Sequence, residues 1–417
     1  MGLIQDSQGG HIARAGVTST QSNTRLTGID AARGLALIGL MVVHILPGEN
    51  ENTGNPTLLF QPFFGHSAAL FAFLAGAGLA LSSGGPRPHR GRRMAGNRLG
   101  LAVRAVLIGV IALVIAEFMP TDDPPAYGIL LFYSVFFLLA IPFLHLRPRA
   151  LFLIAAVFAI VSPILLQRLT PVLPDWSSTN PTLGHLFSEP AAVASQLLLT
   201  GTYPALPYMC YILVGLGVGR LDLRRNSRLA YVAGTGAALA ILASATSSIL
   251  LYLAGGYEQL LATSGMTVEG LDEAILWGPE TVPDTSGWWL AIVTPHTNMP
   301  LSIANSLGLG LLVTGLFLLV ARKAGRWLAP LAAMGTMTLT LYSAHLLALS
   351  PEVHYQEPYV WFLVHLTVAI AFSMIWKQWL GQGPLERPVA AAARNFRRIV
   401  EYAPAEDSDG ASGSAIR

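Results

Sequence analysis

Apolar runs of about twenty residues recur along the whole chain. Each run is long enough to cross a hydrocarbon core of about 30 Å as a helix. Charged residues make up only 12% of the sequence, about half of their usual share in soluble domains. The runs are continuous rather than alternating, which excludes a β-barrel, and a helix satisfies its own backbone groups in lipid. The sequence therefore predicts an all-α, polytopic integral membrane helix bundle.

The apolar runs predict about ten transmembrane helices. Their approximate ranges are 29–46, 58–82, 99–119, 129–146, 150–167, 203–221, 229–255, 297–321, 327–350 and 358–380. Two further segments are expected to be helical, 267–277 as a short surface helix and 191–199 as an interfacial or partly inserted helix. If 191–199 crosses the membrane instead, the number of spans becomes eleven.

Lysine and arginine alternate between loops in the way that sets the orientation of membrane proteins. Basic residues gather in the loops that we assign to the cytoplasm, at 87–98, 147–149, 220–228 and 322–326. The long segments 169–202 and 256–295 contain no Lys or Arg and are assigned to the outside. This alternation puts both termini in the cytoplasm, with Arg168 at an outer boundary as the exception.

Composition divides the chain into three parts. Residues 1–24 are polar and rich in Gly, Ser, Gln and Thr, which predicts a flexible cytoplasmic tail. Residues 25–388 form the transmembrane domain. Residues 389–417 form a cytoplasmic C-terminal segment, which is expected to be disordered from about residue 404. The first apolar run has no A-x-A-like site after it, so we expect an uncleaved span rather than a signal peptide.

Two polar residues, Arg33 and His44, lie at the two ends of the first span. Eleven steps of 100° bring a helix nearly back to its starting azimuth, so the two side chains share one face. They are about 16 Å apart along the helix axis. A cation at one membrane surface and a titratable base near the other suit a reaction whose two substrates come from opposite sides.

Five of the ten histidines fall in the outer half of predicted spans or at their outer boundaries. They are His44, His66, His296, His345 and His365. Any one of them alone is more often an interfacial or hydrogen-bonded packing residue than a functional one, although polar residues in membranes are often functional. We keep the packing interpretation for His345 and His365. For His44 and His296 we favour a function.

The inner half carries arginines instead. Arg104 lies about two turns into the third span, where it either snorkels to lipid phosphates or helps Arg33 and Arg25 to bind a polyanion such as the phosphates of coenzyme A. Asp30 lies one turn before Arg33 and either belongs to this site or simply pairs with Arg33 and orients it. The single cysteine, Cys210, excludes an internal disulfide and a cysteine-based metal site, and no zinc-binding spacing is evident.

The first span carries a family resemblance. Its sequence, RLTGIDAARGLALIGLMVVHI, resembles the opening of the transmembrane acyltransferase superfamily, and the spacing from Arg33 to His44 is similar to the Arg-x10-His signature of acyltransferase-3 type proteins. The remainder, to about residue 388, resembles the YeiB-like family and the bacterial relatives of heparan-alpha-glucosaminide N-acetyltransferase. The similar segments, in order, are LFAFLAGAGLAL, GTYPALPYMCYILVGLGVGRLDL, PHTNMPLSIANSLG, GTMTLTLYSAHLLAL and GPLERP.

The resemblance implies an acyl-CoA donor, acetyl-CoA above all, bound from the cytoplasm, and a glycan or lipid acceptor whose hydroxyl or amine is presented outside. It makes 25–388 an acyltransferase-like domain in a bacterial cytoplasmic (inner) membrane. Imidazole suits the general base that such a transfer needs at neutral pH. We expect His44 to be this base, with His296 and His66 as its supporting or acceptor-side partners. Arg33, with Arg25 and Arg104, would hold the donor phosphates, and no metal is expected.

A transporter or flippase for a lipid or small solute is the main alternative, because polar intramembrane residues and a Gly- and Pro-rich sixth span also suit transport. Its weakness is that Asp30 and Glu117, the acidic residues available for proton coupling, both lie at span boundaries. A purely structural membrane protein is a third interpretation. Membrane lipids are the expected surroundings, nucleic acid is not an expected partner, and a homo-oligomer is compatible with the sequence.

The predicted topology can be tested by labelling single cysteines in intact cells, with the native chain as the control for Cys210. Asn52→Cys and Asp284→Cys should react with an impermeant thiol reagent from outside, because both residues lie in predicted outer loops. Ala95→Cys should stay unlabelled until the cells are opened. Labelling of Ala95→Cys in intact cells would contradict the topology.

Overall fold

The structure is a computed structural model. It describes residues 9–402 except 177 and 280, and the side chains within this range from Thr27 onward. Helices form nearly all of its regular structure, and the described residues contain no strand beyond one isolated bridge between Glu49 and Pro56. The predicted all-α class is confirmed. The predicted disorder after residue 404 falls outside the described residues.

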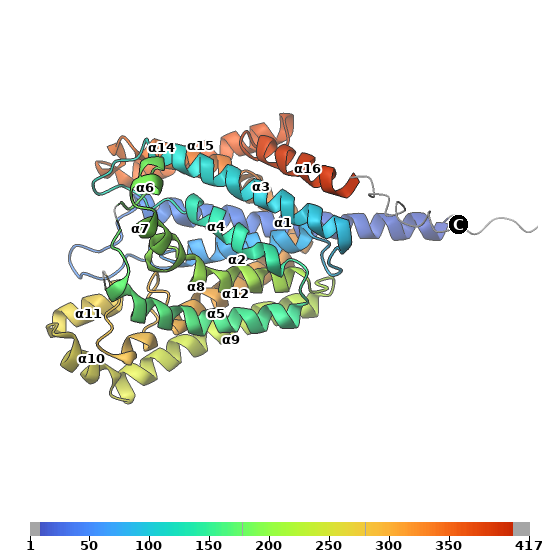
Figure 1. The fold of residues 1–417 in the computed structure, drawn as a ribbon. Helices are drawn as coiled ribbons and strands as arrows, with labels where there is room; N and C mark the ends of the chain where they lie inside the picture. Colours follow the sequence, from blue (N-terminus) through green and yellow to red (C-terminus); the bar gives the residue numbers. More distant parts are fainter. Residues whose placement is uncertain (1–8, 177, 280, 403–417) are drawn as a thin grey trace, which may run out of the picture.

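The helices follow one another in the order expected from the apolar runs (Figure 1). Elements labelled η are 3-10 helices, except η3 and η4, which are π-helical. Their bounds are α1 Gly9–Ile45, α2 His66–Ser82, α3 Gly91–Ala116, α4 Leu130–Ala140, η1 Ile141–Phe143, α5 Pro148–Leu169, η2 Thr170–Val172, α6 Leu183–Ser188, α7 Pro190–Ser195, η3 Gln196–Thr200, α8 Ala205–Gly219, α9 Asn226–Ser248, η4 Ile249–Leu253, α10 Gly256–Ser264, α11 Val268–Trp277, η5 Gly287–Ala291, α12 Pro300–Ala324, η6 Gly325–Leu328, α13 Ala329–Gly335, α14 Thr338–Leu349, η7 Val353–Tyr355, α15 Pro358–Trp379 and α16 Glu386–Tyr402.

Several of these helices are long and apolar enough to cross a membrane, which makes the protein a polytopic membrane bundle. Among the described residues, six qualify by length and composition, and the bent pair of α7–η3 with α8 adds a seventh if it is one span. Three shorter apolar helices, α2, α4 with η1, and α14, lie where spans were also predicted. The exact number of spans, the placement of both termini in the cytoplasm and the division at residues 24 and 388 stay predictions.

Two predicted spans begin at the wrong residue. The second was expected from residue 58, but α2 begins at His66, because the apolar Leu58 and Leu59 lie exposed in a series of turns. His66 is therefore the first residue of its helix instead of lying two turns inside it. The third was expected from residue 99, but α3 begins at Gly91 within the basic loop, so Arg104 lies more than three turns from its start.

Other expectations fail because a helix is interrupted. The ninth span was expected to be continuous over 327–350, but α13 ends at Gly335 and α14 starts at Thr338. Gly335 lies against α1 so closely that a Cβ there would overlap the carbonyl oxygen of Asp30, and a Cβ on Gly34 of α1 would likewise overlap Leu331 of α13. The segment 191–199 is helical as expected, but it becomes π-helical from Gln196 and meets α8 at 46°.

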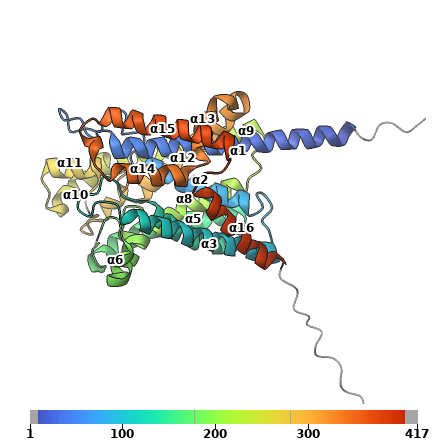
Figure 2. The ribbon, with the colours of Figure 1, turned by 90° about the horizontal axis from the view of Figure 1, so that it is seen from above.

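Helix α1 runs through the middle of the bundle, with α3 and α16 on one side of it and α5 and α9 on the other (Figure 1). It packs against α2, α12, α13, α14 and α15. Helix α15 lies beside α1 and α13 at one edge (Figure 2). α1 is unbroken between Arg33 and His44, so these two polar residues are joined by a continuous helix.

The short helices α10 and α11 project at one end of the bundle (Figures 1 and 2). A separate buried cluster that includes Leu260, Leu271 and Trp289 packs them against η5. Helix α11 confirms the surface helix expected at 267–277. We call this end outer and the opposite end inner, following the loop charges.

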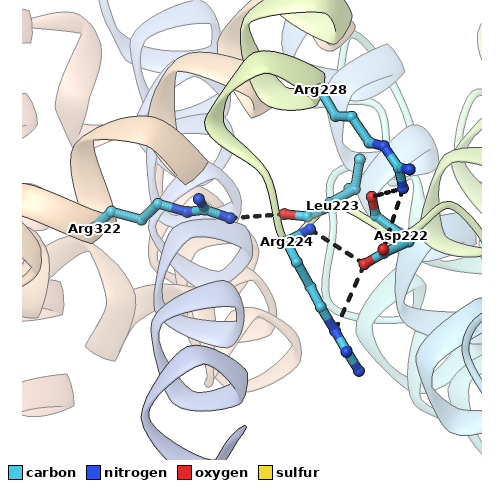
Figure 3. Close-up of polar contacts among 5 residues, drawn as sticks. All are labelled: Asp222, Leu223, Arg224, Arg228 and Arg322. Carbon is cyan, nitrogen blue, oxygen red and sulfur yellow. Dashed lines mark hydrogen bonds and ion pairs between the residues drawn. The ribbon is translucent and has the colours of Figure 1, made fainter. Parts of the chain in front are cut away.

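The predicted inside turns meet at the inner end. Figure 3 shows Arg322, in the last turn of α12, donating from Nη2 to the carbonyl oxygen of Leu223 at 2.7 Å. In the same loop, Asp222 lies 3.6 Å from Arg224 Nε and 3.2 Å from Arg228 Nη1. These pairs are exposed, so they add little to stability.

A buried arginine joins three of these turns. Arg220 follows α8 and is only 3% exposed. Its Nη1 donates to the carbonyl oxygens of Ala80 (3.3 Å), Ser83 (3.3 Å) and Gly85 (2.7 Å), and its Nη2 donates to Ser83 Oγ (2.9 Å) and to the carbonyl oxygen of Leu144. The guanidinium thus supplies a charged donor to carbonyls at the ends of α2 and η1, of which those of Ala80 and Ser83 also accept from backbone N–H groups.

Arg220→Ala should therefore destabilise the protein by about 2–4 kcal/mol, because several buried carbonyls lose a charged donor. The melting temperature of the detergent-solubilised protein measures this loss. Arg224→Ala is the matched control from the same loop and should change stability by about 0–1 kcal/mol, since its partner is exposed. Equal melting temperatures of the two variants would contradict the structural role of Arg220.

Candidate active site

Three histidines from three helices form a chain near the outer end. His44, in the last turn of α1, has its Nδ1 3.2 Å from Nε2 of His345 on α14. The two rings stack with centroids 5.4 Å apart. Nδ1 of His345 lies 2.9 Å from Nδ1 of His365 on α15. The three imidazoles are therefore connected in series, with His345 in the middle.

The orientation of α14 is fixed by Tyr342, one turn before His345 and on the same face. The Tyr342 hydroxyl accepts from the backbone N–H of Ile129 at 3.3 Å and donates to the carbonyl oxygen of Tyr127 at 3.4 Å. Its ring centroid is 6.3 Å from that of His44. Tyr342 therefore ties the histidine-bearing helix to the start of α4.

The other end of α14 is held by Glu386. This carboxylate accepts from the backbone N–H of Thr340 at 3.0 Å and from its hydroxyl at 2.5 Å. The Thr340 hydroxyl in turn accepts from the N–H of Leu385 at 3.0 Å. A negative charge at a helix N-terminus is favourable, and here it makes the break before α14 stable. The GTMTLTLYSAHLLAL and GPLERP segments are thus in direct contact.

His66 and His296 lie near the same end. Nδ1 of His66 is 2.9 Å from the Ser306 hydroxyl of α12. His296 is a neighbouring titratable group of both His44 and His66, and a Cβ on Gly65, the residue before His66, would lie 3.2 Å from the backbone nitrogen of His296. The structure thus brings together the three histidines that the sequence predicts to act, around the outer ends of α1, α2 and α12.

The backbone around His296 is strained. His296 has φ 64° and Asn298 has φ 56°, values that are uncommon for residues other than glycine. The ring of His296 lies between Phe64 and Tyr203, with centroid separations of 5.0 and 5.6 Å. Its Nδ1 is buried and has no hydrogen-bond partner among the described residues. Such strain persists where the surrounding structure enforces it, often at functional sites.

Arg33 is held in place by two contacts. Its Nη1 lies 3.1 Å from Asp30 Oδ1, one turn earlier on α1, and its Nη2 donates to the carbonyl oxygen of Leu74 on α2 at 3.2 Å. Gly78 leaves space for this guanidinium, because a Cβ there would lie 2.5 Å from Nη2. Asp30 thus pairs with and orients Arg33, which was one of its two predicted roles.

Arg104 approaches the same region from α3. Its guanidinium carbon lies 5.2 Å from the centroid of the Phe137 ring of α4. Its side chain is exposed, and its charge interacts with those of Arg33 and Glu386. The side chain of Arg25, the third predicted arginine, lies outside the described residues. The inner site therefore contains two arginines, oriented by a carboxylate and by an aromatic ring.

The structure connects two further histidines to His44. His345 and His365 were interpreted as interfacial or hydrogen-bonded packing residues, and the structure shows that their hydrogen bonds run in series to His44. The available signal was that both lie in the outer half of apolar runs, as His44 does. Sequence could not show that α1, α14 and α15 meet. Within the described range, no group of three or more His, Cys, Asp or Glu residues is placed to hold a metal ion.

Comparison with known proteins identifies the family of this chain. The family model of the catalytic region of heparan-alpha-glucosaminide N-acetyltransferase matches residues 25–255, more than half of the chain. The match includes Arg33, His44, His66 and Arg104. A search of curated proteins finds no match. The chain belongs to the family of membrane proteins defined by the catalytic region of heparan-alpha-glucosaminide N-acetyltransferase.

Proposed function

We propose that the protein transfers an acyl group, acetyl in the simplest case, from acyl-CoA to a hydroxyl or amine of a glycan or lipid acceptor. One observation carries this proposal: the continuous apolar span Thr27–Ile45 of α1 bears an oriented arginine in its inner half and a histidine in a polar cluster at its outer end. The two ends offer different chemistry. The family membership supports an acetyl transfer.

The inner end suits the donor. Arg33 and Arg104 provide guanidinium groups, whose planar forks match phosphate oxygens in charge and geometry. Asp30 and the carbonyl of Leu74 use only part of the five N–H donors of Arg33, so the remaining ones are available to phosphates. The flexible arm of coenzyme A would have to span the roughly 16 Å between Arg33 and His44.

The outer end suits the acceptor. Nδ1 of His44 is occupied by His345, which leaves Nε2 to take a proton from the acceptor. The oxygen or nitrogen attacks the thioester carbonyl while its proton passes to His44 Nε2 and a C–O or C–N bond forms. The C–S bond then breaks, and the same proton returns to the sulfur to release coenzyme A as the thiol. His66 and His296 would contact the acceptor or support His44. The glucosaminide in the name of the family makes an amino sugar the first acceptor to try.

This reaction needs its two substrates to arrive from defined sides of the membrane. Acyl-CoA would come from the cytoplasm to the basic inner end, and the acceptor would come from the outside or from the lipid. The proposed location is a bacterial inner membrane. Neither coenzyme A nor the acceptor has to cross the membrane, because the thioester carbonyl reaches the acceptor within the bundle.

Arg33→Ala should weaken acetyl-CoA binding by about 10- to 100-fold, the loss expected for a charge-assisted hydrogen-bond donor. Arg33→Lys should recover only part of it, since a point charge does not replace a fork. Calorimetry on the solubilised protein measures both. Arg228→Ala, from an exposed inner loop, is the control, and Arg33→Ala with Asp30→Asn tests whether an unpaired carboxylate causes the effect. Unchanged affinity in both Arg33 variants would remove Arg33 from the site.

His44→Ala should lower acyl transfer by about 10²- to 10⁴-fold, the usual contribution of a general base. Acetyl-CoA binding and the melting temperature should change little, because the donor phosphates are held at the other end of α1. Release of coenzyme A thiol and formation of acylated product are measured together. Full activity in a folded His44→Ala variant would end this mechanism, and solute flux without any acylated product would favour a transporter.

A further inference from the structure

We propose that His345 and His365 form a proton relay with His44, which takes the acceptor's proton away from the reacting atoms and returns it to the departing sulfur. This inference rests on the proposed acyl transfer. It gives His345 and His365 a functional role in place of the packing role expected from sequence. Both are positioning residues, because they act through His44 and do not touch the substrates.

The nitrogen pattern is that of a relay. His345 uses both ring nitrogens, Nε2 toward His44 at 3.2 Å and Nδ1 toward His365 at 2.9 Å. A neutral imidazole donates from one nitrogen and accepts at the other, so a single order of N–H groups satisfies the whole chain. His44 and His365 each use only Nδ1, which leaves one free Nε2 at each end of the relay.

Enclosure by protein is greatest at the centre of the chain. His345 is 3% exposed, whereas His44 and His365 are each partly exposed. α15 is also the least buried of the six long apolar helices. A positive charge is more stable at His365 than at the enclosed His345. The relay therefore leads from the reacting atoms to the edge of the bundle.

The groups around His345 favour transfer of a proton through this ring over its retention on the ring. The charged or titratable groups that act on His345 are His44 from α1, His365 from α15 and His354 from η7. Those that act on His44 are His296 and His354. None of these groups is a carboxylate. Within the described residues, no acidic side chain thus fixes the charge on the central imidazole.

The proton count is balanced. At rest, His44 Nδ1–H points to His345 Nε2, and His345 Nδ1–H points to His365 Nδ1. When the acceptor gives its proton to His44 Nε2, each of these N–H protons moves one step, and His365 becomes the imidazolium. As the C–S bond breaks, the protons move back and His44 Nε2–H protonates the coenzyme A sulfur. The products are the acylated acceptor and the free thiol, and each ring regains its starting tautomer.

The test uses the full-length protein in detergent, with acetyl-CoA as donor, glucosamine as the acceptor probe and thiol release as the readout. His345→Gln and His365→Gln keep hydrogen-bonding groups but cannot pass a proton through a ring. We expect kcat to fall by about tenfold or more in each, a part of the full general-base contribution. The KM for acetyl-CoA should stay within about twofold. His185→Gln, in the outer segment away from this chain, is the control.

A second readout separates a relay from packing. Added imidazole should restore several-fold of the lost kcat in His365→Ala, because this position lies at the edge of the bundle, and should not restore it in His345→Ala, which leaves an enclosed space. Loss of activity together with a lower melting temperature and without imidazole rescue at position 365 would make the histidines packing residues. If His345→Gln does not fold, His365→Gln still decides the question.

The outcomes for the relay and for the enzyme are distinct. Unchanged kcat in folded His345→Gln and His365→Gln, with His44→Ala inactive, would overturn the relay and leave acyl transfer standing. Absence of thiol release from the native protein with glucosamine and with a panel of sugar and lipid acceptors would overturn acyl transfer, and the relay would fall with it.

Discussion

Hydrocarbon supplies no hydrogen-bond partner, so the polar groups inside this bundle depend on the protein for theirs. That constraint explains where the polar residues gather. Arg220 donates to carbonyls of two turns at the inner end, and Arg33 bonds to both Asp30 and the carbonyl of Leu74. The outer histidines bind one another and Ser306. Among the described residues, these polar groups therefore lie where helices meet, and the candidate site lies there as well.

Close packing decides which helices meet. Without a hydrophobic force between helices in lipid, small residues that let backbones approach determine the contacts. Gly34 and Gly335 bring α1 and α13 together, and Gly76 and Gly215 do the same for α2 and α8. α1 consequently contacts five other helices. A helix in that position can present one residue to the inner site and another to the outer site without bending.

The sequence predicted the class and the location of most helices because hydropathy is a local property that survives folding. The prediction failed where local hydropathy and tertiary contacts favour different structures. Leu58 and Leu59 are apolar yet exposed in turns, so α2 begins at His66. The break before α14 is stabilised by Glu386, 46 residues away from Thr340. A hydropathy profile contains neither the exposed turns nor this distant carboxylate.

The same division applies to the candidate site. Arg33 and His44 could be paired from sequence because both lie on one helix, where periodicity relates them. His345 and His365 could not, since their contact with His44 depends on the mutual packing of α1, α14 and α15. Their position in the outer halves of apolar runs was visible, but it is equally compatible with packing. Long-range contacts of this kind appear only once the helices are placed.

The two ends of the site differ in the charged groups that surround their cationic or titratable residues. At the inner end Arg33 has a carboxylate partner, and the charged groups that act on Arg104 are Arg33 and Glu386. Those charges are fixed, which suits a substrate whose phosphates are always ionised. At the outer end the described groups acting on His44 are other histidines, so no carboxylate there stabilises a permanent cation. A proton can then enter and leave, as a reaction that deprotonates one substrate and protonates the leaving group of the other requires.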